Sequence, residues 1–199
     1  MSRTPKLART RAEILDAAWA LISQKGAEVS IAEIARAAGI SRQSVYLHFG
    51  TRGGLLMALV QRADERFSIR EKLFACFEIS DPQDRLRGAI RVWLDFVPEI
   101  LPVARDLIRL RDTDAEAAAA WEDRMADLRS WLGQLAASLD RDGALAGGWS
   151  VSEAADYLWA ATSVQSWSLL VSDCRWPATR ADAVLTDAAC AALLGKTSN

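Results

Sequence analysis

The chain has 199 residues, of which 51% are hydrophobic and 25% are charged. This mixture is typical of a globular protein with one domain or two small ones, and it excludes disorder over most of the length. The longest wholly apolar runs span only a few residues, far below the roughly 18 that cross a bilayer, so we expect no contact with a membrane. The basic N-terminus is not followed by an apolar signal core, and we therefore expect a cytoplasmic protein.

Charge is distributed unevenly along the chain. Residues 1–52 carry eight basic and four acidic side chains, whereas the other residues carry 16 basic and 22 acidic ones. A basic end on an acidic body favours a polyanionic partner for that end alone. Three widely spaced cysteines and a single histidine indicate neither a disulfide framework nor a zinc site, and we expect no metal and no cofactor.

Three helices are predicted in the first quarter of the chain. Apolar residues at helical spacing predict the first over residues 9–25. The second follows Ser30, which forms a capping-box pattern with Glu33, and it ends at Gly39. Ser41 caps a third short helix, on which two apolar residues face inward while the polar residues lie outside or at the edge. Two short helices joined by a glycine-containing turn are typical of a helix-turn-helix.

The rest of the chain is also predicted to be helical, so the expected fold class is all-α. A helix begins after residue 51 and runs to residue 67 or, if the apolar pattern is followed further, to residue 77. The helix that begins at residue 82 meets Pro98 and Pro102, which we expect to break or kink it. Further helices are expected over residues 114–142, from Ser150 or Ser152 to about residue 171, and over residues 178–194.

The segment from Val29 to Leu56, VSIAEIARAAGISRQSVYLHFGTRGGLL, resembles the N-terminal motif of the TetR family of transcriptional regulators. The resemblance is specific from about residue 9 to residue 59, and elsewhere it concerns only length, helical content and a closing pair of helices. It implies a three-helix DNA-binding domain over residues 1–52, followed by a larger helical ligand-binding and dimerisation domain over residues 53–199. It also implies a homodimer that binds double-stranded DNA at a palindromic operator.

Carried over onto this sequence, the family motif assigns DNA-binding roles to eight residues. Arg42 and Gln43 are side chains that pair well with guanine and adenine in the major groove, and Ser44 would reach base edges beside them. Tyr46 and His48 would contact phosphates and fix the register. The complete predicted set is Ser41, Arg42, Gln43, Ser44, Tyr46, His48, Thr51 and Arg52.

The helix that starts near residue 51 departs from the family pattern, which usually has a lysine and a glutamate there. Arg52 preserves the positive charge and is expected to contact phosphate. With Thr51 as the cap, backbone amide groups at the start of the helix remain free to donate hydrogen bonds to the same phosphate. Gly53 and Gly54 each cost about 1 kcal/mol relative to alanine in a helix, and we expect them to form a loose hinge at the start of a helix that transmits the ligand signal.

Seven of the eight tryptophans follow the DNA-binding motif. An aromatic residue of a helical domain is more often part of the core than of a ligand site. The family resemblance nevertheless implies an apolar pocket with a few polar anchors, and hence a small apolar or aromatic effector. The candidate ligand-binding residues are Trp93, Trp121, Met125, Trp159, Thr162 and Gln165.

Catalytic motifs are not recognised in the sequence, and we assign no catalytic residues and expect no enzyme. The favoured hypothesis is a ligand-responsive homodimeric regulator, more a repressor than an activator, which a small molecule releases from its operator. Two alternatives stay open: a DNA-binding regulator without a small-molecule effector, and a helical ligand-binding protein or enzyme whose helix-turn-helix is only structural. Specific, salt-dependent DNA binding would separate the last from the others.

Overall fold

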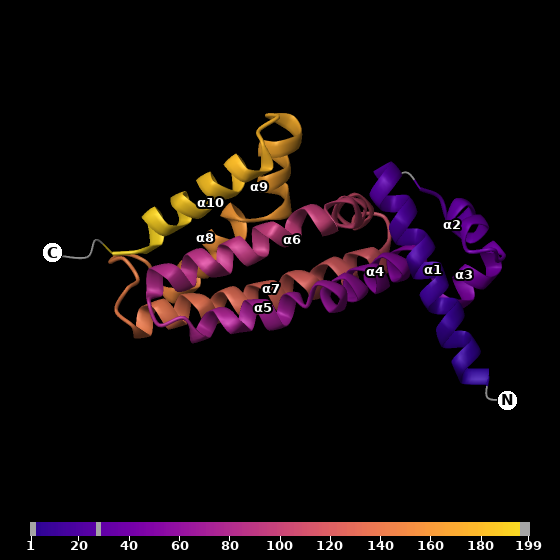
Figure 1. Ribbon diagram of the computed structural model, residues 1–199, viewed down its shortest axis with the longest axis horizontal. Helices are drawn as coiled ribbons and strands as arrows, with labels where there is room; N and C mark the ends of the chain where they lie inside the picture. Colours follow the sequence, from indigo (N-terminus) through magenta and orange to yellow (C-terminus); the bar gives the residue numbers. More distant parts are fainter. Residues whose placement is uncertain (1–2, 27–28, 196–199) are drawn as a thin grey trace. The chain divides into compact units, whose positions relative to one another are not determined.

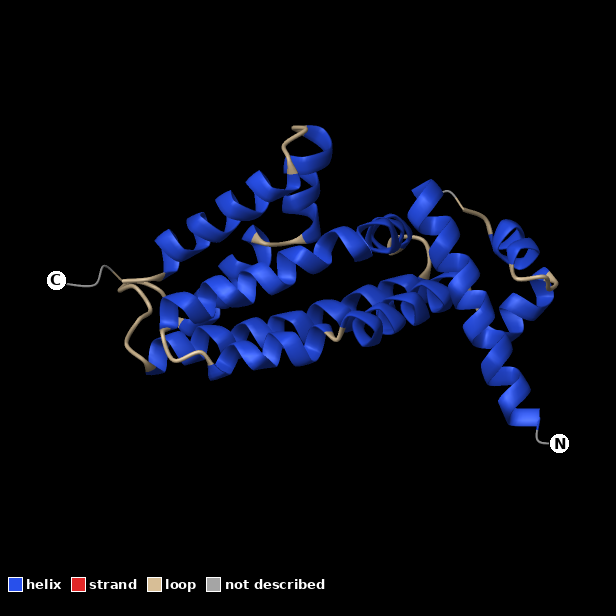
Figure 2. Ribbon diagram, viewed as in Figure 1, coloured by secondary structure: helices blue, strands red, loops and turns tan. Residues whose placement is uncertain are grey.

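The computed structural model describes residues 3–26 and 29–195, and most of these residues lie in helices (Figures 1 and 2). Over those two ranges no strand is found, and the one isolated β-bridge joins Leu145 to Leu194. The predicted all-α fold class is confirmed. None of the helices in this part of the chain is long and apolar enough to span a membrane.

The elements follow one another along the chain as α-helices with two short turns of other helix types (Figure 1). The α-helices are α1 (Arg3–Lys25), α2 (Ile31–Ala37), α3 (Arg42–Phe49), α4 (Arg52–Phe67), α5 (Ile69–Ala75), α6 (Pro82–Leu110), α7 (Ala115–Arg141), α8 (Val151–Ala161), α9 (Val164–Ser168) and α10 (Ala178–Leu193). The short turns are the 3-10 turn η2 (Cys76–Glu78) and the π-helical turn η3 (Leu169–Asp173).

The chain divides into two compact units. The first comprises residues 1–64 and 99–123, and the second comprises residues 65–98 and 124–199. The helices α4, α6 and α7 each contribute residues to both units. The functional boundary that we placed after residue 52 stays a prediction.

The core of the first unit is built on one face of α1. Ile14, Ala18 and Ile22 recur at intervals of four residues and are almost completely buried. The helix α1 contacts α2, and α2 contacts α3, so that buried Ile34 of α2 belongs to the same core. α1 begins six residues earlier than predicted, at Arg3.

The second unit has an apolar core to which α6, α7 and α8 contribute. Leu86 and Leu94 of α6, Leu135 and Leu139 of α7 and Leu158 of α8 are fully buried. Leu135 and Leu139 lie four residues apart, at the helical spacing from which α7 was predicted. The helix α10 contacts α8.

A buried arginine ties the loop before α6 to the C-terminal end of α7. Arg85 donates hydrogen bonds to the carbonyl oxygens of Ile79 and Ser80, at 2.9 and 3.2 Å, and pairs with Asp142 at 2.7 Å. These partners compensate the cost of burying a guanidinium group. These contacts fix the position of the loop that leads into α6. The first turn of α6 is capped by Asp81, as expected.

The helices around Ser68 and around the two prolines differ from the predicted ones. The predicted continuation past residue 67 is interrupted at Ser68, which has left-handed backbone angles (φ 49°, ψ 42°). This change of direction begins α5, whose Ile69 and Leu73 are buried. At Pro98 and Pro102, where we expected a break or a kink, α6 is not broken and continues to Leu110. Buried residues before and after the two prolines stabilise the continuous helix, since tertiary packing supplies most helical stability in proteins.

The predicted helix from residue 150 to residue 171 is divided in two. Its cap is Ser150, which forms a capping box with Glu153. The helix α8 then ends at Ala161, where the Thr162 carbonyl oxygen accepts a hydrogen bond from Trp93 Nε1 at 2.8 Å. The hydroxyl of Ser163 caps α9 by accepting from the Ser166 amide at 3.1 Å. A serine that caps a new turn competes with continuation of the preceding helix.

Candidate functional site

Helix α2 begins with a complete capping box. The Ser30 amide donates to Glu33 Oε2 at 2.9 Å, and the Glu33 amide donates to Ser30 Oγ at 3.2 Å. The pKa of Glu33 is lowered to about 2. The largest cause is the hydrogen bond from the Ser30 backbone, followed by those from the Ser30 side chain and the Lys25 ammonium. The start of the helix-turn-helix is therefore fixed by local polar groups, as its sequence predicted.

The turn between α2 and α3 has the geometry of a helix-turn-helix. Gly39 has a left-handed backbone (φ 69°), which glycine adopts without strain. The Ile40 amide donates to the Ala35 carbonyl oxygen at 2.9 Å. Ser41 then caps α3 by accepting a hydrogen bond from the Ser44 amide at 3.1 Å. The two helices and the glycine turn thus occur at the predicted residues.

One face of α3 is anchored and the other is accessible. Val45 and Phe49 are buried, and the guanidinium of Arg11 in α1 lies over the Phe49 ring at 4.9 Å from its centroid. The side chains of Arg42 and Gln43 are exposed. Of the other predicted DNA-binding residues on this helix and its cap, Ser41 and Tyr46 are exposed, and Ser44 and His48 are half-buried.

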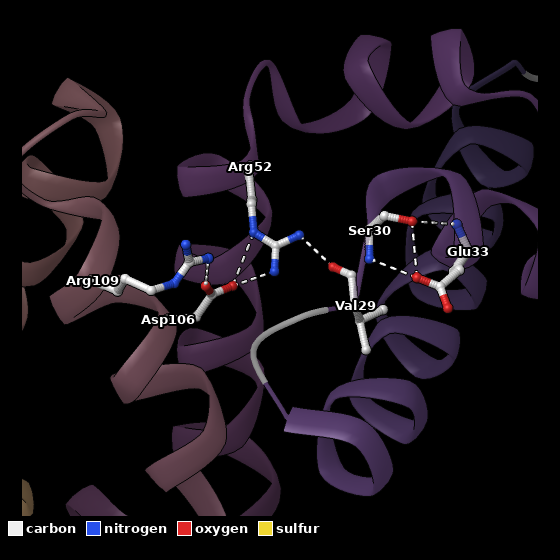
Figure 3. A network of polar contacts seen from close by, with 6 residues as sticks. All are labelled: Val29, Ser30, Glu33, Arg52, Asp106 and Arg109. Carbon is white, nitrogen blue, oxygen red and sulfur yellow. Dashed lines mark hydrogen bonds and ion pairs between the residues drawn. The ribbon is translucent and has the colours of Figure 1, made fainter.

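Arg52 makes contacts within the protein that the sequence did not predict (Figure 3). Its Nε donates to Oδ2 of Asp106 at 2.9 Å, its Nη2 contacts the same oxygen, and its Nη1 donates to the Val29 carbonyl oxygen. Asp106 is fully buried, and its other carboxylate oxygen accepts a hydrogen bond from Arg109 at 2.7 Å. We expected Arg52 to contact a phosphate. In the structure it joins the start of α4 to α6 and to Val29, the residue before the Ser30 cap.

Thr51 caps α4 as expected, and the anion beside it is a carboxylate of the protein itself. Thr51 Oγ1 accepts a hydrogen bond from the Gly54 amide at 3.2 Å and donates one to Glu116 of α7. A carboxylate at the N-terminal end of a helix is favoured by the helix dipole. The position that we expected to receive a phosphate is thus next to Glu116.

Gly53 and Gly54 are packing residues, which corrects the expectation of a loose hinge. An ideal Cβ on Gly53 would lie 2.4 Å from the backbone nitrogen of Ala117, and one on Gly54 would lie 2.1 Å from the carbonyl oxygen of Phe49. Only glycine permits such close approach of the backbone of one segment to another. The first turn of α4 is therefore in tight contact with the first turn of α7 and the last residue of α3.

Sequence reasoning missed three residues at this site: Asp106, Glu116 and Leu47. Asp106 has a recognisable signal, because it lies in register with buried Val103 on the apolar face of α6. Glu116 has none, because nothing local connects it to Thr51. Leu47 is apolar on the side of α3 opposite its buried residues, and 81% of its surface is exposed.

The predicted ligand-binding residues are only partly brought together. In the second unit Trp93 donates to the carbonyl oxygen of Thr162, and Trp159 Nε1 lies 3.4 Å from the Met125 sulfur. The guanidinium of Arg129 lies 4.6 Å from the centroid of the Trp159 ring. Gln165 is exposed, and Trp121 is buried within the first unit.

The helix-turn-helix segment matches a known family. Residues 14–59 match the family model described as bacterial regulatory proteins, tetR family. An uncharacterized HTH-type transcriptional regulator of Mycobacterium tuberculosis (strain ATCC 25618 / H37Rv) is 37% identical over 97 residues, which are 48% of this chain and 46% of that protein. The chain thus spans about half the length of the curated relatives that it matches.

Solved structures resemble nearly the whole chain. A TetR-family regulator from Mesorhizobium loti MAFF303099 is 22% identical, with 98% of this chain and 100% of that chain covered and a TM-score of 0.71. A regulator from Saccharomonospora viridis in complex with choline is 17% identical, with coverages of 95% and 100% and a TM-score of 0.78. The SmeT–triclosan complex is 20% identical, with coverages of 95% and 93% and a TM-score of 0.71.

At these identities the structural likeness shows the fold, and the family model covers the DNA-binding motif. Together they confirm the resemblance that the sequence predicted. The chain has the N-terminal motif of the TetR family and the fold of its solved members.

A substitution at Gly53 tests the close contact between α4 and α7. We expect Gly53→Ala to lower the free energy of unfolding by about 1–3 kcal/mol, because the added methyl group overlaps the backbone of Ala117. The control is Gly133→Ala in α7, where no atom lies within 4 Å of the added Cβ and alanine gains about 1 kcal/mol of helix propensity. Chemical denaturation of both variants measures the difference. A gain of stability in both would contradict the contact.

Proposed function

We propose that the protein is a homodimeric transcriptional repressor whose α3 reads double-stranded DNA at a palindromic operator. The observation that carries this proposal is the two-sided character of α3. Val45 and Phe49 hold one side in the core, while Arg42, in the first turn, and Gln43 have exposed side chains. The net positive charge of residues 1–52 supports a polyanionic partner.

The individual roles follow from side-chain chemistry and position. Arg42 suits bidentate pairing with guanine, and Gln43 suits pairing with adenine. Ser44 follows them in the chain and is half-buried at the edge of the same surface. Tyr46 and His48 are donors for phosphate oxygens on either side of the groove. We assign Thr51 and Arg52 an indirect role, in which they hold the first turn of α4 so that α3 is presented in a fixed orientation.

The dimer is proposed to form through α10. Val184, Ala188 and Ala191 are exposed and recur at intervals of four and three residues, so they form one apolar stripe on this helix. Small residues on such a stripe permit close approach of a second helix. Ala181 is fully buried within the subunit, so it lies outside this accessible stripe.

The effector is proposed to be a small apolar or aromatic molecule that binds near Trp93, Met125, Trp159 and Thr162. Two proteins of the same fold were solved with a small molecule, choline in one and triclosan in the other. In this chain the cation over the Trp159 ring is already provided by Arg129, which disfavours a cationic ligand on that face. We therefore favour an uncharged aromatic compound over a quaternary ammonium.

Replacement of Arg42 tests base reading. DNA fragments bound by the purified protein are first selected from a genomic library, and the affinity for the selected and for unrelated duplexes is then measured at several salt concentrations. We expect Arg42→Ala to reduce the preference for the selected sequence by about 10- to 100-fold. The control Arg141→Ala, an exposed arginine at the end of α7, should preserve the preference. Absence of any sequence preference in the unaltered protein would contradict the proposed function.

A charge on α10 tests the dimer. Ala188→Arg should place an unpaired guanidinium in the interface, and we expect monomers that no longer bind the palindromic site tightly. Sedimentation velocity measures the oligomeric state. Ala126→Arg, at an exposed position of α7, is the matched control and should stay dimeric. If Ala188→Arg also stays dimeric, the interface lies elsewhere.

Triclosan and choline serve as probes of the ligand site. We expect triclosan to weaken operator binding, and operator DNA to weaken triclosan binding by the same factor, because coupling between two sites is reciprocal. Trp159→Ala should lower the affinity for triclosan about threefold to tenfold through loss of aromatic contact, while Trp176→Ala should not. Fluorescence titration with and without operator DNA measures both quantities. A stronger effect of choline than of triclosan would overturn the proposed ligand class.

A further inference from the structure

We propose that Leu47 is a specificity-determining residue that recognises the methyl group of a thymine in the operator. This inference rests on the proposed function of α3 as a DNA-reading helix. It begins from one observation: 81% of the Leu47 surface is exposed, more than that of any other large apolar side chain that the structure describes. An apolar side chain this exposed gains nothing from the fold itself.

The position of Leu47 on α3 directs it away from the core. Successive residues of an α-helix are rotated by about 100°, which places Leu47 about 160° from both Val45 and Phe49. Those two residues are buried and define the inward side of the helix. Gln43 lies about 40° from Leu47 and one turn away, so the two share the outward side. Leu47 is therefore at the centre of the surface that would enter the groove.

The chemistry around Leu47 favours DNA as the partner that covers it. Its neighbours on the accessible surface are Gln43, Tyr46 and His48, which offer hydrogen-bond donors, and residues 1–52, to which α3 belongs, carry excess positive charge. A surface of polar donors with one apolar side chain complements a groove of acceptors in which the thymine C5 methyl is the apolar group. A protein partner that docks by apolar contact would require a larger continuous apolar area.

Substitution of uracil for thymine isolates the contact. Uracil pairs with adenine as thymine does and differs only by the absence of the methyl group. Each thymine of the selected operator is replaced in turn by deoxyuridine, and the affinity of the full-length protein is measured by fluorescence anisotropy. At one thymine in each half-site we expect a loss of about fourfold, the factor that corresponds to one buried methyl group.

The decisive variant is Leu47→Ala, which removes the isobutyl group from an exposed position. In this variant the same replacement of thymine by uracil should have no effect, so that the protein and DNA changes form a double-mutant cycle. Leu169→Ala, whose side chain is also exposed, is the matched control and should keep the full thymine dependence. The two variants should unfold at the same denaturant concentration as the unaltered protein.

The outcomes separate this inference from the function on which it rests. If the protein selects a sequence but Leu47→Ala leaves every uracil effect unchanged, the role of Leu47 is overturned and the proposed function stands. If Leu47→Ala alters the oligomeric state in sedimentation with no change in thymine dependence, the residue belongs to an interface between copies of the chain. If the unaltered protein selects no sequence, both proposals fail.

Discussion

The buried carboxylate of Asp106 is the point at which three segments of the first compact unit are joined. A carboxylate with no exposed surface is stable only if cationic groups and hydrogen bonds compensate its lost hydration. Arg52 and Arg109 supply this compensation, one on each oxygen. Because Arg52 also donates to the Val29 carbonyl oxygen, the same ion pair links α6, the first turn of α4 and the residue before α2. Removal of one partner of such a pair typically costs about 3–5 kcal/mol.

The other contacts at the start of α4 act on the same few residues. Thr51 is bonded to Glu116, and Gly53 allows the backbone of α7 to approach where any side chain would prevent it. The Glu116 carboxylate lies where the helix dipole favours a negative charge, so it occupies the electrostatic position that a phosphate would otherwise prefer. The orientation of the helix-turn-helix within its unit is therefore set by contacts from α6 and α7 as well as by its own short core.

The sequence predicted elements that local chemistry determines, and it failed where the determining partner is distant. The capping box at Ser30 and the glycine turn were found because all their groups lie within a few residues, and Ser150 was one of two candidate caps for the same reason. The break at Ser163 was missed because the Trp93 indole that binds the preceding carbonyl belongs to another helix. The contacts of Arg52 and Gly53 within the protein were missed for the same reason: each involves a residue more than 50 positions away in the sequence.

Helix α3 combines, within eight residues, side chains that the fold needs and side chains that it leaves exposed. Val45 and Phe49 are needed by the fold, and Ser41 is needed to begin the helix. Arg42, Gln43 and Leu47 are exposed, so their replacement changes the surface offered to a partner without creating a cavity or an unpaired buried group. Under the proposed function, substitution at these positions changes the DNA sequence that α3 reads, while the ion pair at Asp106 and the contacts of α4 keep the helix in the same place.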